Sequence, residues 1–258
     1  MNITNSDITT SAPGIERVRH ELKRRSLTVT EIEKLTPKML RITLSGEELA
    51  DFVSLAPDDH IKIAAPSPDG PDGVERREYT PRSFDNAART LVIDFAVHDA
   101  GPATQWALEA RPGDTLVVGG PRGSAVVSSD VRRWLLIGDE TALPAIGRRI
   151  EEAARGTIIT SIVAVTNAAE HQTFDTEADL TTLWVHRPLT EAADPTALLN
   201  AVKTVELEKG TFAWIAAEAK VTRAIRSYLV EERGHPLTWM KASGYWVMGK
   251  ADSKENFG

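Results

Sequence analysis

The residues best suited to chemistry lie in a short run at 77–82, where a tyrosine and a threonine stand between arginines. Tyr79 offers an aromatic face on which a flat ring can stack, and Thr80 offers a hydroxyl for a ring edge. Arg77 and Arg82 carry guanidinium groups that suit phosphate oxygens. The run therefore indicates a site for a flat, anionic cofactor, although a solvated strand end with a few charges has the same composition.

A second run follows the apolar stretch at 91–97. After His98, Gly101 permits a tight turn and Pro102 suits the first turn of a helix that continues over 103–110. A loop that leads into a helix in this way presents free backbone N–H groups to an anion, so a pyrophosphate would fit there. An ordinary strand-to-helix turn is the alternative, and a lone histidine is more often structural than catalytic.

A third run, at 138–146, joins an apolar stretch to a helical one. This is the position at which open α/β sheets bind ligands. The run lacks the G-x-G-x-x-G pattern, and Asp139 and Glu140 occupy places where glycines would let a pyrophosphate approach. Because carboxylates repel phosphate, the sequence argues against tight dinucleotide binding in the usual pose.

Two further segments complete the set. The glycine-rich turn at 119–124 carries one cation, Arg122, and could equally be a plain hairpin. The segment 241–249 places two aromatic residues side by side, which could pack in a core or cover a flat cofactor.

Composition limits the class of protein. A chain of 258 residues is long for one ordinary domain and sufficient for two, and its 41% hydrophobic and 26% charged residues are typical of a globular fold. The net charge of −7 argues against a nucleic-acid partner. Since there is no cysteine, redox chemistry would belong to an organic cofactor or a bound metal complex.

The N-terminal segment carries no targeting signal. Residues 1–14 are rich in Thr, Ser and Asn and are expected to form a disordered tail, while the basic stretch 15–25 could begin as a short helix on a solvated surface. No run approaches the roughly 18 apolar residues of a membrane helix. We therefore expect a cytoplasmic protein without a membrane partner, and a monomer.

The N-terminal half consists of short, alternating, β-branched runs separated by glycine and proline, including a cluster at 66–73. These expected strands cover residues 27–32, 39–44, 60–65, 90–98 and 115–118. Their close spacing predicts a small antiparallel barrel over about residues 20–128.

The pattern of apolar residues changes after residue 130. Buried strands are expected at 134–138, 158–165, 184–186 and 212–217, and helices at 142–155, 196–205 and 221–233. This alternation predicts a parallel sheet covered by helices. The sequence thus predicts two domains, a barrel over 15–129 and an α/β domain over 130–258, with the joint near 128–130.

In this order, the segments resemble the siderophore-interacting protein family of flavin reductases, cytoplasmic relatives of the ferredoxin-reductase fold. The likeness rests on Arg-x-Tyr-Thr at 77–80, His-Asp-x-Gly-x-Ala-x-x-Trp-Ala at 98–107, Gly-Pro-Arg-Gly-Ser at 120–124, Gly-Asp-Glu-Thr-x-x-Pro-Ala at 138–145 and Gly-Tyr-Trp at 244–246. Each motif is weak alone, whereas five in register are specific. The resemblance implies a six-stranded antiparallel FAD-binding barrel followed by an α/β NAD(P)H-binding domain.

The resemblance also implies roles for single residues. Tyr79 would lie against the isoalloxazine ring, with Thr80 near its reactive edge and Arg77 beside them. The other expected FAD contacts are Asp94, Ala96, His98, Ala103, Thr104, Trp106, Tyr245 and Trp246, of which His98, Ala103 and Thr104 would border the ribityl and pyrophosphate portion. The expected NAD(P)H contacts are Asp139, Glu140, Thr141, Ala142 and Glu218. A basic substrate pocket would consist of Lys62, Arg122 and Lys241, each of which could also be an ordinary surface cation.

The electron donor stays open at this level. Thr166 and Asn167, after the second α/β strand, offer no arginine for a 2′-phosphate, so a preference for NADPH over NADH comes from the family alone. Arg148 and Arg149 could help, although charges on a helix surface are a commoner explanation.

The resemblance implies a ferric-siderophore reductase in which FAD passes electrons from NAD(P)H to Fe(III) held by a catecholate or hydroxamate siderophore. One alternative is the same flavoprotein with reduced ferredoxin as donor. Another is a siderophore-binding protein without turnover. None of these needs a protein nucleophile, and the six histidines show no metal-ligand spacing.

Overall fold

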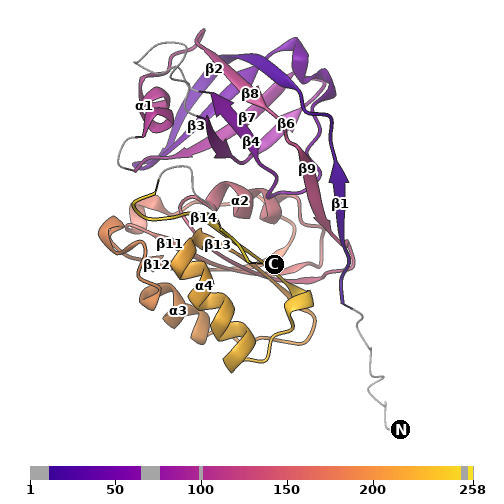
Figure 1. The fold of residues 1–258 in the computed structure, drawn as a ribbon, viewed down its shortest axis with the longest axis vertical. Helices are drawn as coiled ribbons and strands as arrows, with labels where there is room; N and C mark the ends of the chain where they lie inside the picture. The colour runs from indigo at the N-terminus through magenta and orange to yellow at the C-terminus, as the bar shows by residue number, and fades with distance from the viewer. Residues whose placement is uncertain (1–11, 65–75, 99–100, 251–254, 258) are drawn as a thin grey trace.

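The computed structural model of the chain describes residues 12–64, 76–98, 101–250 and 255–257 (Figure 1). The N-terminal half of the described chain forms an antiparallel barrel, and the C-terminal half forms a parallel sheet covered by helices. Most of the expected tail and the Gly/Pro cluster at 66–73 lie outside the described residues.

Seven strands form the barrel sheet, in the order β5-β4-β8-β2-β3-β7-β6, and every neighbouring pair is antiparallel. They are β2 (Arg24–Thr36), β3 (Met39–Ser45), β4 (Ile61–Ala64), β5 (Arg76–Tyr79), β6 (Ser83–Asp85), β7 (Thr90–Ala96) and β8 (Thr115–Gly119). The edge strands β5 and β6 are consecutive in the chain, so residues 80–82 pass from one edge to the other and close the barrel. Pro81 lacks an N–H and interrupts the pairing here, so β5 and β6 are two short strands that the set of expected strands did not include.

Alternating side chains fill the barrel. Leu27 and Val29 of β2, and Ile42 and Leu44 of β3, are almost completely buried. Their neighbours are exposed on β2 and half-buried on β3, which follows the period of a half-buried strand. Helix α1 (Pro102–Glu109) adds Ala103 to the same core.

The basic stretch after residue 14 is extended, which corrects the expected helix. Strand β1 (Ile15–Arg19) pairs antiparallel with β9 (Gly123–Val127), and the stretch ends where β2 begins. A side chain at Gly123 would place its Cβ 2.4 Å from the carbonyl oxygen of Val18, so the two strands approach this closely only at a glycine. The turn before β9 therefore does not close a simple barrel hairpin.

The second sheet has the order β12-β11-β10-β13-β14-β15 and is parallel except for its last strand. Its strands are β10 (Arg133–Asp139), β11 (Ile158–Val165), β12 (Asp179–His186), β13 (Thr211–Glu218), β14 (Met240–Trp246) and β15 (Glu255–Asn256). The α-helices are α2 (Leu143–Glu151), α3 (Thr196–Lys203) and α4 (Ala219–Ser227), and a π-helical turn, η5 (Tyr228–Glu232), extends α4. Short 3-10 turns lie at η1 (Glu47–Asp51), η3 (Ala168–Glu170), η4 (Leu189–Glu191) and η6 (Leu237–Trp239).

Helices cover both faces of this sheet. Helices α3 and α4 pack on one face, and α2 lies on the other, between the sheet and the barrel (Figure 1). Met39 of the barrel belongs to the apolar cluster around α2, so the two halves share buried surface. Among the described helices, none is long and apolar enough to cross a membrane.

Candidate functional site

Tyr79 stands at the end of β5, on the barrel wall next to α1. Its ring centroid lies 4.5 Å from that of Phe95, and the half-buried residue packs against the barrel core. Burial raises the pKa of the Tyr79 hydroxyl well above its usual range, while the nearby charge of Arg77 and a hydrogen bond with Thr104 act in the opposite direction. A neutral aromatic ring with one side supported by Phe95 is suited to stacking on a flat ligand.

Arg82 does not serve a ligand phosphate, which corrects the first interpretation of the motif. Its side chain is 5% exposed and donates from Nη1 and Nη2 to Glu151 on α2, at 2.7 and 2.5 Å. Its Nε lies 3.5 Å from Asp94. Arg82 therefore holds the segment after Thr80 against the second half of the protein, and Thr80 itself is buried.

Helix α1 begins with a buried N-terminus. Its N-cap residue, Gly101, provides no side-chain acceptor, and Ala103 and Thr104 in the first turn are buried. The first N–H groups of a helix have no partner inside the helix, and no side-chain acceptor for these two donors is found among the described residues. Because Thr104 also contacts Tyr79, an anionic group attached to a flat ring fits this corner, and these residues fit FAD.

The remaining residues expected at the FAD site divide into two groups. Trp106 packs with its ring 5.9 Å from Phe95, and His98 is exposed at the end of the strand. Asp94 is buried, and its carboxylate accepts two hydrogen bonds from Arg41, at 2.7 and 2.8 Å. Ala96 packs against the apolar cluster of the second half, so Asp94 and Ala96 support the wall of the site.

Buried carboxylates organise the carboxyl ends of β10 and β13. The strand that follows β10 in the chain, β11, lies on one side of β10, and β13 lies on the other side. The carboxyl ends of β10 and β13 are therefore at the position where such sheets bind ligands. Asp139 accepts from the N–H of Glu218 at 3.0 Å and from Trp246 Nε1 at 2.9 Å. Glu218 caps α4 and accepts from the N–H of Met248 at 3.1 Å. The two acids thereby fix the Tyr245–Trp246 segment over the edge of the sheet.

Glu140 is paired, which changes the argument about phosphate repulsion. Arg187 donates to its carboxylate at 2.7 and 3.3 Å. Burial and the charge of Asp139 raise the pKa of Glu140, and the arginine counters both effects. Thr141 donates its hydroxyl to Asp139 at 2.6 Å, and Ala142 is fully buried at the start of α2. Because Asp139 and Glu140 each accept hydrogen bonds from the protein, they should repel the phosphates of a dinucleotide less than two unpaired carboxylates would.

Arg187 is the residue at this edge that sequence reasoning did not name. It follows β12 directly, and its place just after a predicted buried strand is the feature of the sequence by which it could have been found. By contrast, Arg148 does not face a 2′-phosphate, because its guanidinium donates to Ser54 and to the carbonyl of Pro81 in the barrel. Arg149 lies over the ring of Trp134, at 4.3 Å.

The three expected substrate cations lie on one side of the barrel and on β14. Lys62 Nζ is 3.7 Å from Glu78, and Lys241 Nζ is 2.5 Å from Asp58. Arg122 is exposed in the turn between β8 and β9.

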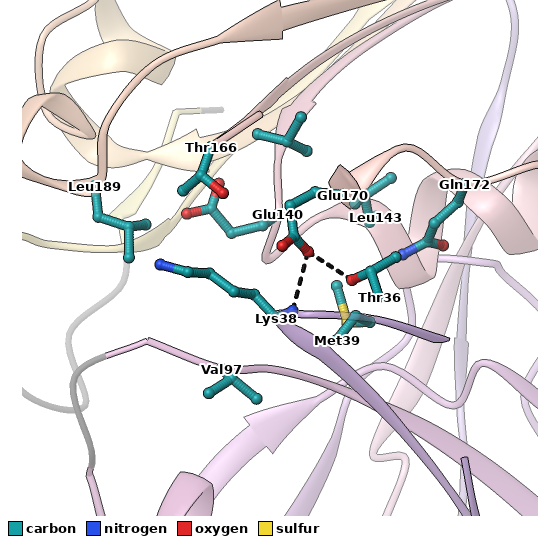
Figure 2. Close-up of a pocket in the computed structure, with 11 residues that line it drawn as sticks. Thr36, Lys38, Met39, Val97, Glu140, Leu143, Thr166, Glu170, Gln172 and Leu189 are labelled. Atoms are coloured by element: carbon teal, nitrogen blue, oxygen red, sulfur yellow. Dashed lines mark hydrogen bonds between the residues drawn. The ribbon is translucent and has the colours of Figure 1, made fainter. Parts of the chain in front are cut away.

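A cavity separates the β2–β3 hairpin from the carboxyl ends of the sheet (Figure 2). It is narrow and opens to solvent. Lys38 extends across it toward Leu189, while Glu170 accepts from the Thr36 hydroxyl at 2.5 Å and from the Lys38 N–H at 3.1 Å. The cavity lies beside Glu140 and thus next to the expected donor site.

The antiparallel barrel followed by a parallel sheet covered by helices defines the ferredoxin-reductase-like fold. Solved structures agree with this class. A ferredoxin reductase of carbazole 1,9a-dioxygenase has a TM-score of 0.66 over 85% of this chain and 66% of its own, at 17% identity. This likeness confirms the predicted fold.

The chain belongs to the siderophore-interacting protein family. Residues 131–249 match the family model described as siderophore-interacting protein, and residues 28–74 and 72–125 match the siderophore-interacting FAD-binding domain. The NADPH-dependent ferric-chelate reductase of Escherichia coli is 33% identical over 90% of this chain and 96% of its own length. The crystal structure of a siderophore utilization protein from T. fusca has a TM-score of 0.85 at 36% identity, covering 93% of this chain and 98% of that one. The predicted family and the expected FAD-binding domain are confirmed.

Proposed function

We propose that this protein is a ferric-siderophore reductase that uses FAD to pass electrons from NAD(P)H to chelated Fe(III), releasing Fe(II). The observation that carries the proposal is the half-buried Tyr79 ring beside the buried, uncapped N-terminus of α1. The FAD-binding family model and the E. coli ferric-chelate reductase support it.

FAD, when bound, accepts a two-electron hydride and gives up its electrons singly, which suits a nicotinamide donor and an Fe(III) acceptor. Siderophore oxygens prefer Fe(III), so reduction weakens their hold on the metal. The chain's part is to bind and orient. Tyr79 would support the flat ring, the N–H groups of Ala103 and Thr104 would bind the phosphates, and Thr80 would lie beside the ring.

The second half would present the donor. Asp139 and Glu218 hold Trp246 and Met248 at the edge of the sheet, so the C-terminal aromatic pair covers the side of the site opposite the barrel. Arg187 provides a cation at the same edge, 2.7 Å from Glu140, and could exchange that carboxylate for a phosphate.

The test is an anaerobic rapid-mixing experiment on the purified protein loaded with FAD. Flavin absorbance should bleach with NADPH or NADH and return when a ferric siderophore is added, while an Fe(II) chelator reports released iron. Bleaching by neither nucleotide, with activity from reduced ferredoxin, would support the protein-donor alternative.

A protein that binds no flavin and holds a ferric chelate unreduced would instead be a binding protein, and the proposal would fail. Tyr79→Ala is the matched variant, because it removes the stacking face and should lower flavin content. The expected monomer and the cytoplasmic location remain proposals, which light scattering and cell fractionation test.

A further inference from the structure

The expected substrate cations are matched by carboxylates that the sequence does not reveal. Lys62 on β4 and Glu78 on β5 are direct cross-strand partners, and their charged atoms are 3.7 Å apart. His60 Nε2 lies at the same distance from Glu78. Opposite charges on facing strand positions attract each other, so Lys62 is partly neutralised before any ligand arrives.

The second pair is closer and less exposed. Lys241 Nζ on β14 lies 2.5 Å from Asp58 Oδ2, and the side chains are 21% and 14% exposed. Trp214 Nε1 donates to the same oxygen at 3.1 Å, which fixes the carboxylate in place. A buried pair of this kind is hard to separate, because the charge that is left behind loses its partner away from water.

These groups lie near one another between the barrel and the sheet, because Lys241 Nζ also donates to the carbonyl of Ala125 on β9 at 3.5 Å, and Lys62 pairs with Gly119, three residues before Arg122. The charges of Asp58, Asp139, Glu78 and Asp59, together with burial, raise the pKa of Tyr245 well above its usual range. Acids from both halves of the protein therefore act on a single hydroxyl. Asp59 is also buried and accepts from the hydroxyls of Ser54 and Ser124.

The positive and negative charges of this site therefore offset each other, and the site is not strongly basic. Three cations, Lys62, Arg122 and Lys241, face at least as many carboxylates, and only Arg122 has no side-chain partner among the residues that the structure describes. A highly anionic ligand would have to separate both pairs or lie against their carboxylates. A ligand of little charge would meet neither cost.

We propose that this site selects a ferric chelate with little or no net charge, such as a tris-hydroxamate, and that Asp58 and Glu78 determine this specificity by disfavouring a trianionic tris-catecholate. The inference rests on the proposed function, since it names the substrate class of the same site. Arg122 remains available to a polar edge of the chelate.

Calorimetric titration of the FAD-loaded protein with gallium(III) chelates tests it, because gallium keeps the charge of the iron complex and is not reduced. The wild type should bind the neutral tris-hydroxamate more tightly than the tris-catecholate. In Asp58→Asn and in Glu78→Gln, the ratio of the two dissociation constants should shift roughly tenfold toward the trianion, as removal of one close negative charge predicts. Glu208→Gln, which removes a carboxylate paired with Arg133 at the amino end of β10, should leave the ratio unchanged.

Tighter binding of the tris-catecholate by the wild type, an unchanged ratio in both variants, or no binding of either complex would overturn the inference. Reduction is measured separately with the ferric chelates. If the protein binds the neutral gallium complex but reduces no ferric chelate with either nucleotide, the proposed function fails while the charge selection stands.

Discussion

Replacing Arg148 should release the barrel from α2. The guanidinium is 4% exposed and donates to the Ser54 hydroxyl at 2.8 Å, to the Ser54 carbonyl at 3.0 Å and to the Pro81 carbonyl at 3.1 Å. Methionine has a similar length and no donor, so Arg148→Met removes this donor from the two buried carbonyls and leaves the Ser54 hydroxyl only its hydrogen bond to Asp59. At about 1–3 kcal/mol for each unsatisfied group, with some relaxation, the free energy of unfolding should fall by about 3–5 kcal/mol.

The effect should reach the cofactor site, because Pro81 follows Thr80 directly. We expect flavin affinity to fall together with stability. Urea unfolding followed by tryptophan fluorescence gives the first quantity, and titration of the apoprotein with FAD gives the second.

Glu152→Gln is the matched control. Glu152 is the half-exposed partner of Arg148, at 2.7 Å, and its neutralisation should cost less than about 1 kcal/mol. A loss of similar size in both variants, or an unchanged flavin affinity in Arg148→Met, would refute the reasoning that the buried acceptors depend on this arginine.

Three further predictions concern single side chains. Tyr79→Phe keeps the ring and loses only the hydrogen bond with Thr104, so FAD affinity should fall a few-fold. Tyr79→Ala also removes the ring and should lower FAD affinity much further. Equal losses of affinity in a flavin titration would contradict stacking. Lys23 and Arg25 lower the pKa of Asp51 to about 2, so its contribution to stability should be present above pH 4 and lost as the pH falls toward 2. Asp51→Asn should flatten unfolding curves measured across that window, and an unchanged pH dependence would count against the pairing. Arg122→Ala should raise the KM for an anionic ferric chelate more than Lys62→Ala does, because Glu78 already neutralises Lys62. Steady-state reduction assays measure the KM of both variants, and a larger rise in Lys62→Ala would contradict the importance of that pair.

Local pattern was enough to predict much of the fold. Alternation around Leu27 and Val29 predicts a half-buried strand, and the apolar runs at β10 and β11 predict strands buried on both faces. The site motifs were found because each has a distinctive residue order, and Tyr79, Ala103 and Thr104 lie together as expected.

Pairing partners were not predictable in the same way. The stretch that forms β1 is polar and basic, and it is extended because β9 offers it an unpaired edge more than a hundred residues later in the chain. Arg82 appeared to be a phosphate ligand because its place in the motif does not show that Glu151 and Asp94 face it.

The sequence by itself predicted the order of elements and the residues that carry the motifs, because periodicity and spacing are local properties of the chain. The class of cofactor followed from the resemblance of those motifs to a family. Only the tertiary structure decided which charges are free to meet a ligand. Lys241 and Asp58 lie far apart in the chain and 2.5 Å apart in space, and the field at a site depends on such distances rather than on residue types.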